Sequence, residues 1–192
     1  MPAAVLAGGA SRRMGRPKAE LAYGAGTLLS HQAGRLSEVF TEVFAVLKEP
    51  PRLPAGPALV LLDGSPEHAA IHGLARALEE VEDRVFVLAV DLPILPESLM
   101  RAIAQRALGS DALAVVPRAD GRLQPLAAVW RRAALPATRA RIERHELSLS
   151  ALAEEIGAEI LSEEECRRAD PSQNAFANLN TVEDYVAHRE RA

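Results

Sequence analysis

The chain has 192 residues, with 22 Lys and Arg against 26 Asp and Glu, so its formal net charge at pH 7 is −4. This length suits one domain with a sizeable core, and 48% hydrophobic and 25% charged residues exclude disordered and fibrous proteins. The mild acidity argues against a general electrostatic grip on nucleic acid or an anionic membrane. We therefore expect a single domain over residues 1–192, with no nucleic-acid or membrane partner.

Cysteine content and apolar run lengths suggest a compartment. Cys166 is the only cysteine, so no intrachain disulfide can form and a reducing environment is the default. The apolar start of the chain has no basic segment before it, and the longest apolar runs fall far short of the roughly 20 residues of a membrane span. These features predict a cytoplasmic protein.

Short apolar runs alternate with amphipathic stretches along most of the chain. Strands are expected at 2–7, 43–47, 58–62, 84–90, 112–116 and 123–130, helices at 27–40, 67–81 and 96–108, a mostly helical stretch from 131 to 155, and a last helix at 181–189. The run 84–90 is apolar on both faces, which is typical of a parallel strand covered by helices. The alternation predicts a three-layer α/β fold, with a Rossmann-like, mostly parallel sheet and helices on both faces.

The residues that directly follow the predicted strands are the first candidates for a ligand site. In such sheets a ligand binds beyond the carboxyl ends of the strands, where the winding changes direction. The positions there are Gly8-Gly9, Lys48, Asp63 and Asp91. Glycines, a lysine and two acids are therefore expected at one edge of the sheet.

The segment Leu6-Ala7-Gly8-Gly9-Ala10-Ser11-Arg12-Arg13-Met14-Gly15-Arg16-Pro17-Lys18 is the densest signal in the chain. Glycines let the backbone approach a ligand closely and turn its N–H groups toward an anion. Four cations within seven residues, in an otherwise acidic chain, then favour a polyphosphate site over a plain strand-to-helix turn. Five residues separate Gly9 from Gly15, where a Walker loop has four, so the segment is not a P-loop.

This loop resembles the signature of the molybdenum cofactor guanylyltransferases, the molybdopterin-guanine dinucleotide synthesis protein A type within the nucleotidyltransferase family. Further stretches occur in the family's order: Asp63, Asp91-Leu92-Pro93, Gln124-Pro125-Leu126 and Phe176-Ala177-Asn178-Leu179-Asn180-Thr181. The resemblance covers essentially the whole chain. It implies a nucleotide-diphospho-sugar transferase-like fold and transfer of GMP from GTP to the terminal phosphate of molybdopterin, with release of pyrophosphate.

The resemblance also implies roles for individual residues. Those expected to bind GTP are Leu6, Ala7, Gly8, Gly9, Lys18, Asp63, Gly73 and Asp91. Arg13, Lys18 and Asp91 would be catalytic, and Asp91 would hold the Mg²⁺ cofactor. Gln124, Asn178 and Asn180 would bind the acceptor. The substrates would be GTP and molybdopterin, and other proteins of molybdenum cofactor biosynthesis are candidate partners.

Two other functions remain open at this point. One is a cytidylyltransferase or other nucleotidyltransferase that acts on a different phosphorylated acceptor. Gly9 favours GTP, whereas only Gly73 remains of the glycine-rich stretch that the family usually carries at 69–73. The other is a noncatalytic nucleotide-binding protein, against which the presence of both Lys18 and Asp91 argues.

Overall fold

The computed structural model describes residues 1–8 and 17–177. Its strands are β1 (Ala3–Leu6), β2 (Ala22–Tyr23), β3 (Gly26–Thr27), β4 (Val43–Leu47), β5 (Leu59–Leu62), β6 (Arg84–Ala89), β7 (Ala114–Ala119), β8 (Arg122–Leu123), β9 (Ala127–Arg131) and β10 (Glu159–Leu161). Its helices are α1 (Leu28–Ser37), α2 (Ala70–Glu80), α3 (Glu97–Leu108), α4 (Leu135–Glu143), α5 (Leu149–Glu155) and α6 (Glu163–Ala169), with 3₁₀ turns at Lys18–Glu20 and Arg132–Ala134.

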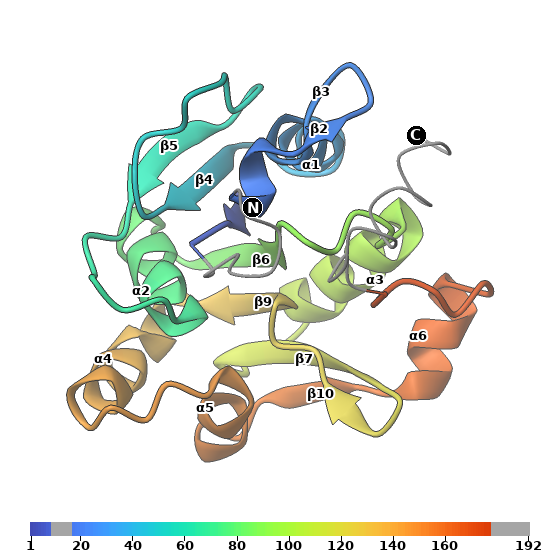
Figure 1. Cartoon of the computed structure of the whole chain (residues 1–192). Helices are drawn as coiled ribbons and strands as arrows, with labels where there is room; N and C mark the ends of the chain where they lie inside the picture. Colours follow the sequence, from blue (N-terminus) through green and yellow to red (C-terminus); the bar gives the residue numbers. More distant parts are fainter. Residues whose placement is uncertain (9–16, 178–192) are drawn as a thin grey trace.

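A central eight-stranded sheet organises the molecule (Figure 1). Its strand order is β10-β7-β9-β6-β1-β4-β5, and β8 pairs with β7 outside this path. The pairs β1–β4, β1–β6, β4–β5 and β7–β10 are parallel, while β9 runs antiparallel to both β6 and β7. The predicted α/β fold with a mostly parallel sheet and helices on both faces is confirmed.

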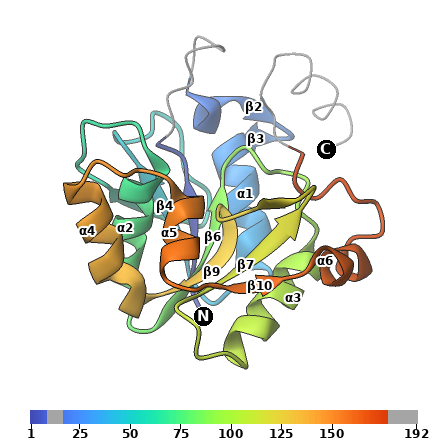
Figure 2. The same cartoon turned by 90° about the horizontal axis from the view of Figure 1, so that it is seen from below.

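Alternate residues of each strand pack into two different cores, one on each face of the sheet. Ala3 and Val5 of β1 belong to the core under α1, α3 and α6, whereas Ala4 and Leu6 belong to the core under α2, α4 and α5. This follows from the two-residue period of a strand. Figures 1 and 2 show the two helical layers on opposite sides of the sheet, which makes three layers.

The helices predicted at 27–40, 67–81 and 96–108 are present as α1, α2 and α3, but their ends differ by up to three residues: α2 begins at Ala70, and Ala69 before it offers no side-chain cap. Thr27 caps α1 by accepting a hydrogen bond from the Ser30 amide, and the Ser30 hydroxyl accepts in turn from the Thr27 amide. Pro96 precedes α3, at the start of the predicted helix 96–108. The last predicted helix, 181–189, falls outside the described residues.

The second half of the chain departs from the prediction in two places. The predicted strand 123–130 is interrupted at Gln124–Leu126, so Gln124 lies in the turn between β8 and β9. β8 and β9 both pair antiparallel with β7, at Arg118–Ala119 and at Ala114–Val115, so the two strands follow one another along the same neighbour and the turn is a break between them. After residue 155 the chain also contains β10 and α6, neither of which was predicted; β10 has only three residues, too few to show a period-two pattern.

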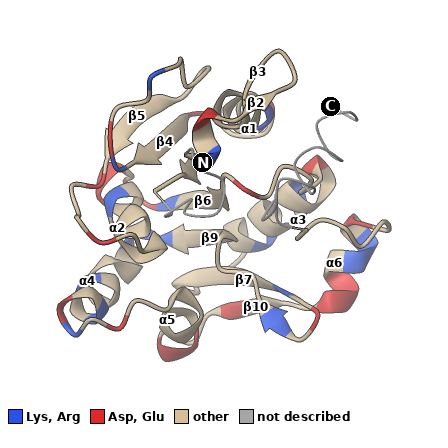
Figure 3. Ribbon diagram, viewed as in Figure 1, with Lys and Arg blue, Asp and Glu red and all other residues tan. Residues whose placement is uncertain are grey.

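Charged residues of both signs lie side by side on the outer helices (Figure 3). On α6, Arg167 pairs with Glu163 and Arg168 with Glu164, four residues apart in each case. Such exposed pairs add little stability individually. Within residues 1–8 and 17–177, no helix combines the length and the apolarity that crossing a membrane requires.

The chain leaves β1 in one direction, through β4 to β5, and then returns to add β6 on the other side of β1. The winding therefore changes direction between β1 and β6. Their carboxyl ends form the crevice in which this class of sheet binds ligands. The fold thus directs attention to Gly8, which follows β1, and to Asp91, which follows β6.

Candidate active site

A pocket of about 250 Å³ lies at this crevice. Its lining residues come from the ends of β1, β4, β5 and β6 and from the start of α2: Leu6, Ala7, Gly8, Lys18, Val46, Asp63, Ala69, Ala70, Gly73, Ala89, Val90, Asp91 and Leu126. Seven of the eight residues predicted to bind the nucleotide are among them. The eighth, Gly9, and the predicted catalytic Arg13 lie outside the described residues.

Lys18 and Asp91 meet inside this pocket. Lys18 lies on the 3₁₀ turn Lys18–Glu20, and its Nζ donates a hydrogen bond to Asp91 Oδ2 at 2.8 Å. The two side chains are 19% and 25% exposed, so both are accessible from the pocket. A cation and a carboxylate are thus held next to one another at the rim of a concave site.

The loop that carries Asp91 is held from below by α1. Arg35 donates to the Pro93 carbonyl oxygen at 2.6 Å and also to the Leu95 carbonyl oxygen. A further hydrogen bond links Arg35 to Gln32 Oε1 at 3.2 Å. Burial lowers the pKa of Arg35 from its usual value, although a guanidinium remains charged at neutral pH. The backbone after Asp91 is therefore fixed by a partly buried cation.

Asp63 lines the same pocket as Lys18 and Asp91, on the side formed by the end of β5. Its side chain is only 2% exposed, and its Oδ1 accepts hydrogen bonds from Lys48 Nζ at 2.9 Å and from the Ser65 amide at 3.0 Å. Lys48, which the sequence places on this edge of the sheet, is absent from the pocket lining and lies behind Asp63. The sequence indicated this lysine's position but not its partner.

Two glycines keep the pocket open. A Cβ at Gly8 would lie 3.3 Å from Lys48 Cε and 3.4 Å from Asp63 Oδ2, which is tighter than most contacts of real Cβ atoms. At Gly73 a Cβ would lie 3.4 Å from Leu6 Cδ2, at the limit of ordinary van der Waals contact, so a glycine here leaves room between α2 and the Leu6 side chain. At Gly8 a side chain would crowd Lys48 and Asp63, and its absence leaves the backbone open to a ligand.

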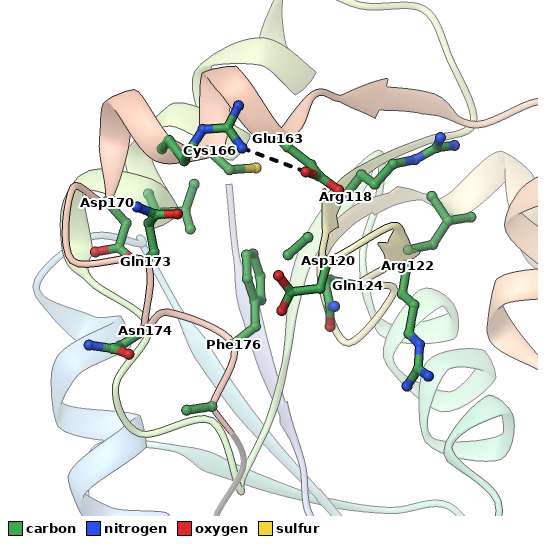
Figure 4. A pocket seen from close by; sticks show the side chains of 15 residues that line it. Arg118, Asp120, Arg122, Gln124, Glu163, Cys166, Asp170, Gln173, Asn174 and Phe176 are labelled. Atoms are coloured by element: carbon green, nitrogen blue, oxygen red, sulfur yellow. Dashed lines mark ion pairs between the residues drawn. The ribbon is translucent and has the colours of Figure 1, made fainter.

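Gln124 does not line this pocket. It lines a second and larger cavity, of about 670 Å³, whose walls are Leu99, Arg118, Ala119, Asp120, Arg122, Leu123, Gln124, Glu163, Cys166, Arg167, Asp170, Gln173, Asn174, Phe176 and Ala177. Figure 4 shows Asp120, Arg122 and Gln124 on one side and Asp170, Gln173 and Asn174 on the other. Asn178 and Asn180, the other predicted acceptor residues, lie outside the described residues.

The two cavities are neighbours. Leu126 lines the smaller one and Gln124 the larger one, so the turn Gln124–Leu126 stands between them. The Ala89 amide donates to the Leu126 carbonyl oxygen at 2.8 Å, and Trp130 Nε1 donates to the Pro125 carbonyl oxygen at 3.1 Å. These bonds fix the turn to β6 and β9.

Several lining residues of the larger cavity were not predicted. One sequence signal could have indicated them, because Asp120-Gly121 is a typical hairpin dipeptide and both residues have positive φ, 49° and 72°. That turn brings Arg118 and Arg122 to the cavity wall. Cys166 also lines it, and burial raises the pKa of its thiol, so the sulfur stays protonated at neutral pH.

The residues suit Mg²⁺ only with a substrate present. Within the described part of the chain, no three His, Cys, Asp or Glu side chains converge on a metal site. Asp91 offers a hard oxygen ligand that is accessible from the pocket. An ion held by one carboxylate, substrate phosphates and water is a usual arrangement for Mg²⁺, and Asp91 fits it.

Comparison with known proteins agrees with this geometry. The model of the MobA-like NTP transferase domain matches residues 3–159. The chain belongs to this family. A probable molybdenum cofactor guanylyltransferase of Pelotomaculum thermopropionicum is 33% identical over 196 residues, which cover 96% of this chain and 90% of that protein.

Two further known proteins are similar to this chain. A probable molybdenum cofactor guanylyltransferase of Mycobacterium tuberculosis is 43% identical over 133 residues. The aligned part is 66% of this chain and 66% of that protein, so this chain spans just under two thirds of that relative's length. The crystal structure of molybdopterin-guanine dinucleotide biosynthesis protein A from Archaeoglobus fulgidus superposes with a TM-score of 0.86. It covers 100% of this chain and 98% of its own, at 22% sequence identity, and so supports the fold.

Proposed function

We propose that this chain transfers GMP from GTP to the terminal phosphate of molybdopterin, as a single nucleotidyltransferase domain over residues 1–192. The observation that carries the proposal is the meeting of Lys18 and Asp91 beside Gly8, in the pocket at the crevice of the sheet. A nucleotidyltransferase needs three features close together: a cation to pair with phosphate, a carboxylate to bind the metal ion, and backbone without a side chain that the nucleotide can approach. The names of the relatives from Pelotomaculum and Mycobacterium support guanylyl transfer to the molybdenum cofactor.

In the proposed reaction an oxygen of the acceptor's phosphate attacks the α-phosphorus of GTP. A bond forms between them as the bond from the α-phosphorus to the bridging oxygen breaks, and pyrophosphate leaves. A phosphate monoester has its second pKa near about 6, so the nucleophile is already anionic at neutral pH and needs no general base. The protein then has to supply positioning and charge neutralisation.

The residues of the pocket can do both. Lys18 is placed to pair with a phosphate oxygen, and the backbone at Ala7 and Gly8 can approach the nucleoside closely. Mg²⁺ held at Asp91 would neutralise phosphate charge during the transfer. Asp63 is placed to accept a hydrogen bond from the nucleotide at the opposite wall.

The larger cavity is the proposed acceptor site. It adjoins the nucleotide pocket across the turn Gln124–Leu126, and its lining combines the Gln124 amide with three arginines and three acids: Arg118, Arg122, Arg167, Asp120, Glu163 and Asp170. Arg167 pairs with Glu163, so Arg118 and Arg122 are the cations that suit an acceptor's phosphate. Asn178 and Asn180 remain proposed acceptor residues on the strength of the family resemblance alone.

The test is pyrophosphate release by the purified protein with Mg²⁺, molybdenum cofactor and each nucleoside triphosphate in turn. Release with GTP alone supports the proposal, and release with CTP alone makes the protein a cytidylyltransferase. Nucleotide binding without release under any condition supports a noncatalytic protein. Reactions without acceptor are the control, because they separate transfer from simple hydrolysis.

The proposed setting is the cytoplasm, since the chain's one cysteine requires no oxidising compartment.

A further inference from the structure

Lys48, directly after β4, has all of its hydrogen-bonding capacity used inside the protein. Its Nζ donates to Asp63 Oδ1 at 2.9 Å, to the Ser65 carbonyl oxygen at 3.0 Å and to the Glu67 carbonyl oxygen. An ammonium group has three N–H donors and no acceptor, so none remains for a ligand. Its side chain is 14% exposed. Lys48 therefore stands next to the nucleotide pocket without being able to bind the nucleotide itself.

The two oxygens of Asp63 are in different situations. Oδ1 accepts from Lys48 and from the Ser65 amide. Oδ2 has no hydrogen-bond partner in the described part of the chain, and it lies 3.4 Å from the position that a Gly8 Cβ would take. Asp63 also lines the nucleotide pocket. One oxygen is thus anchored, and the other is left for a donor in the pocket.

We propose that Lys48 is a positioning residue for nucleotide selection, which fixes the segment Asp63–Glu67 so that Asp63 presents Oδ2 to a hydrogen-bond donor of the nucleotide. This proposal rests on the nucleotide-binding role proposed for Asp63. An ionised carboxylate only accepts hydrogen bonds, so it selects an N–H or O–H group and repels a carbonyl. The orientation of this carboxylate then decides which nucleotide fits.

Electrostatics gives the reason for a lysine at this position. A carboxylate that is only 2% exposed stays ionised at low cost only when a cation lies beside it. Without Lys48, the Asp63 carboxylate would lose the donor that fixes Oδ1 and would be free to turn away from the pocket. That change removes an oriented acceptor from the pocket wall. His68, which directly follows this segment, contacts the loop after β1, because His68 Nδ1 lies 3.1 Å from the Gly8 carbonyl oxygen.

Equilibrium titration of GTP in the presence of Mg²⁺, without acceptor, tests the proposal. Lys48→Met should weaken GTP binding about tenfold, the cost of one charge-assisted hydrogen bond. Asp63→Asn should weaken it to a similar degree. The double variant should bind nearly as Asp63→Asn alone does, because Lys48 acts through Asp63. The proposal would be overturned if Lys48→Met weakened GTP binding tenfold both in the unaltered protein and in the Asp63→Asn variant. Unchanged GTP affinity in Lys48→Met alone would overturn it too.

Glu67→Gln is the matched control. It changes the side chain that contacts His72 but keeps the main-chain oxygen that Lys48 contacts, so GTP affinity should stay as in the unaltered protein. An equal loss in Glu67→Gln would contradict the proposal, because any disturbance of the segment would then suffice. If Lys48→Met unfolds, the double variant, which lacks the unpaired buried charge, still provides the comparison with Asp63→Asn.

Analogues identify the donor and separate this proposal from the proposed reaction. ITP lacks the 2-amino group of guanine and 2′-deoxyGTP lacks a ribose hydroxyl. Asp63→Asn should not change the affinity for the analogue that lacks the group contacted by Asp63. If Asp63→Asn weakened the binding of ITP and of 2′-deoxyGTP as much as that of GTP, contact of Asp63 with either group would be contradicted. All these measurements are of binding, so they stand even if the protein transfers nothing to molybdopterin.

Discussion

Lys18 Nζ lies 2.8 Å from Asp91 Oδ2, although 73 residues separate the two in the chain. In the absence of ligand each charge therefore has the other as a partner. In the proposed function, a nucleoside triphosphate bound with a divalent cation would offer phosphate oxygens to Lys18 and a positive ion to Asp91. The ion pair holds the two side chains next to one another in the pocket, and the substrate would then replace the contact between them.

Asp91→Ala should abolish turnover and leave the fold intact. The substitution removes the proposed metal ligand, and Asp91 is partly exposed, so its loss leaves no buried group without a partner. Steady-state rates and a thermal melt check this, with a loss of at least about a hundredfold in kcat expected. Asp111→Ala is the matched control, because Asp111 is fully exposed. Retained activity in Asp91→Ala would remove Asp91 from the metal role.

Lys18→Arg should lower kcat at least about tenfold, although the charge is kept. A guanidinium is planar and longer than an ammonium, so it cannot occupy the position of Nζ beside Asp91. The chain has 22 Lys and Arg, and only Lys18 and Lys48 are lysines. Kinetics at saturating GTP provide the measurement. Near-normal turnover would mean that the lysine at 18 reflects composition alone.

Arg35→Met should impair catalysis indirectly, through the loop that carries Asp91. The change leaves the Pro93 and Leu95 carbonyl oxygens without their donor and should cost about 1–3 kcal/mol of unfolding free energy. The concentration of Mg²⁺ needed for half-maximal activity should rise, and binding of Mn²⁺ in the presence of GTP, followed by EPR, should weaken. Arg101→Met is the control, since Arg101 is exposed and pairs mainly with Glu97. An unchanged metal requirement would assign Arg35 a purely structural role.

Gln124→Ala should raise the KM for the acceptor about tenfold and leave GTP affinity unchanged. The side-chain amide makes no hydrogen bond within residues 1–8 and 17–177, so it is available to a ligand. The turn itself is held by main-chain bonds, from the Gln124 amide to the Pro117 oxygen and from the Ala127 amide to the Gln124 oxygen. Kinetics with each substrate varied separately distinguish the two effects. A change in GTP affinity would show that the two cavities are not separate sites.

Acidification should weaken the attachment of β10. The pKa of Glu159 is lowered from its usual value, mainly by a hydrogen bond from the Ser110 side chain and next by one from the Arg106 side chain. A lowered pKa in the folded state means that the stabilisation is present above the unfolded pKa, near about 4.3, and is lost as pH falls through the folded value. The unaltered protein should therefore lose more stability below this pH than Glu159→Gln does. Equal pH profiles from denaturant unfolding would contradict this.

The sequence by itself determined the class of fold and most of the proposed nucleotide pocket. Buried apolar runs that alternate with amphipathic helices predict parallel strands, although β9, which is equally buried, is antiparallel to both of its neighbours. Residues that follow the parallel strands gather at one edge. Gly8, Asp63 and Asp91 were placed in the pocket by this argument, without any knowledge of strand order. The family resemblance added Gly73, which lines the pocket from inside α2.

Only the tertiary structure decided which of these groups touch. The contact between Lys18 and Asp91, and that between Lys48 and Asp63, depend on the order of β5, β4, β1 and β6, which no local pattern encodes. The structure also placed Gln124 in a separate cavity, since a turn interrupts the predicted strand there. The local sequence indicates which segments are apolar enough to be buried and where turns occur. Contacts between residues far apart in the chain depend on how the whole sheet packs.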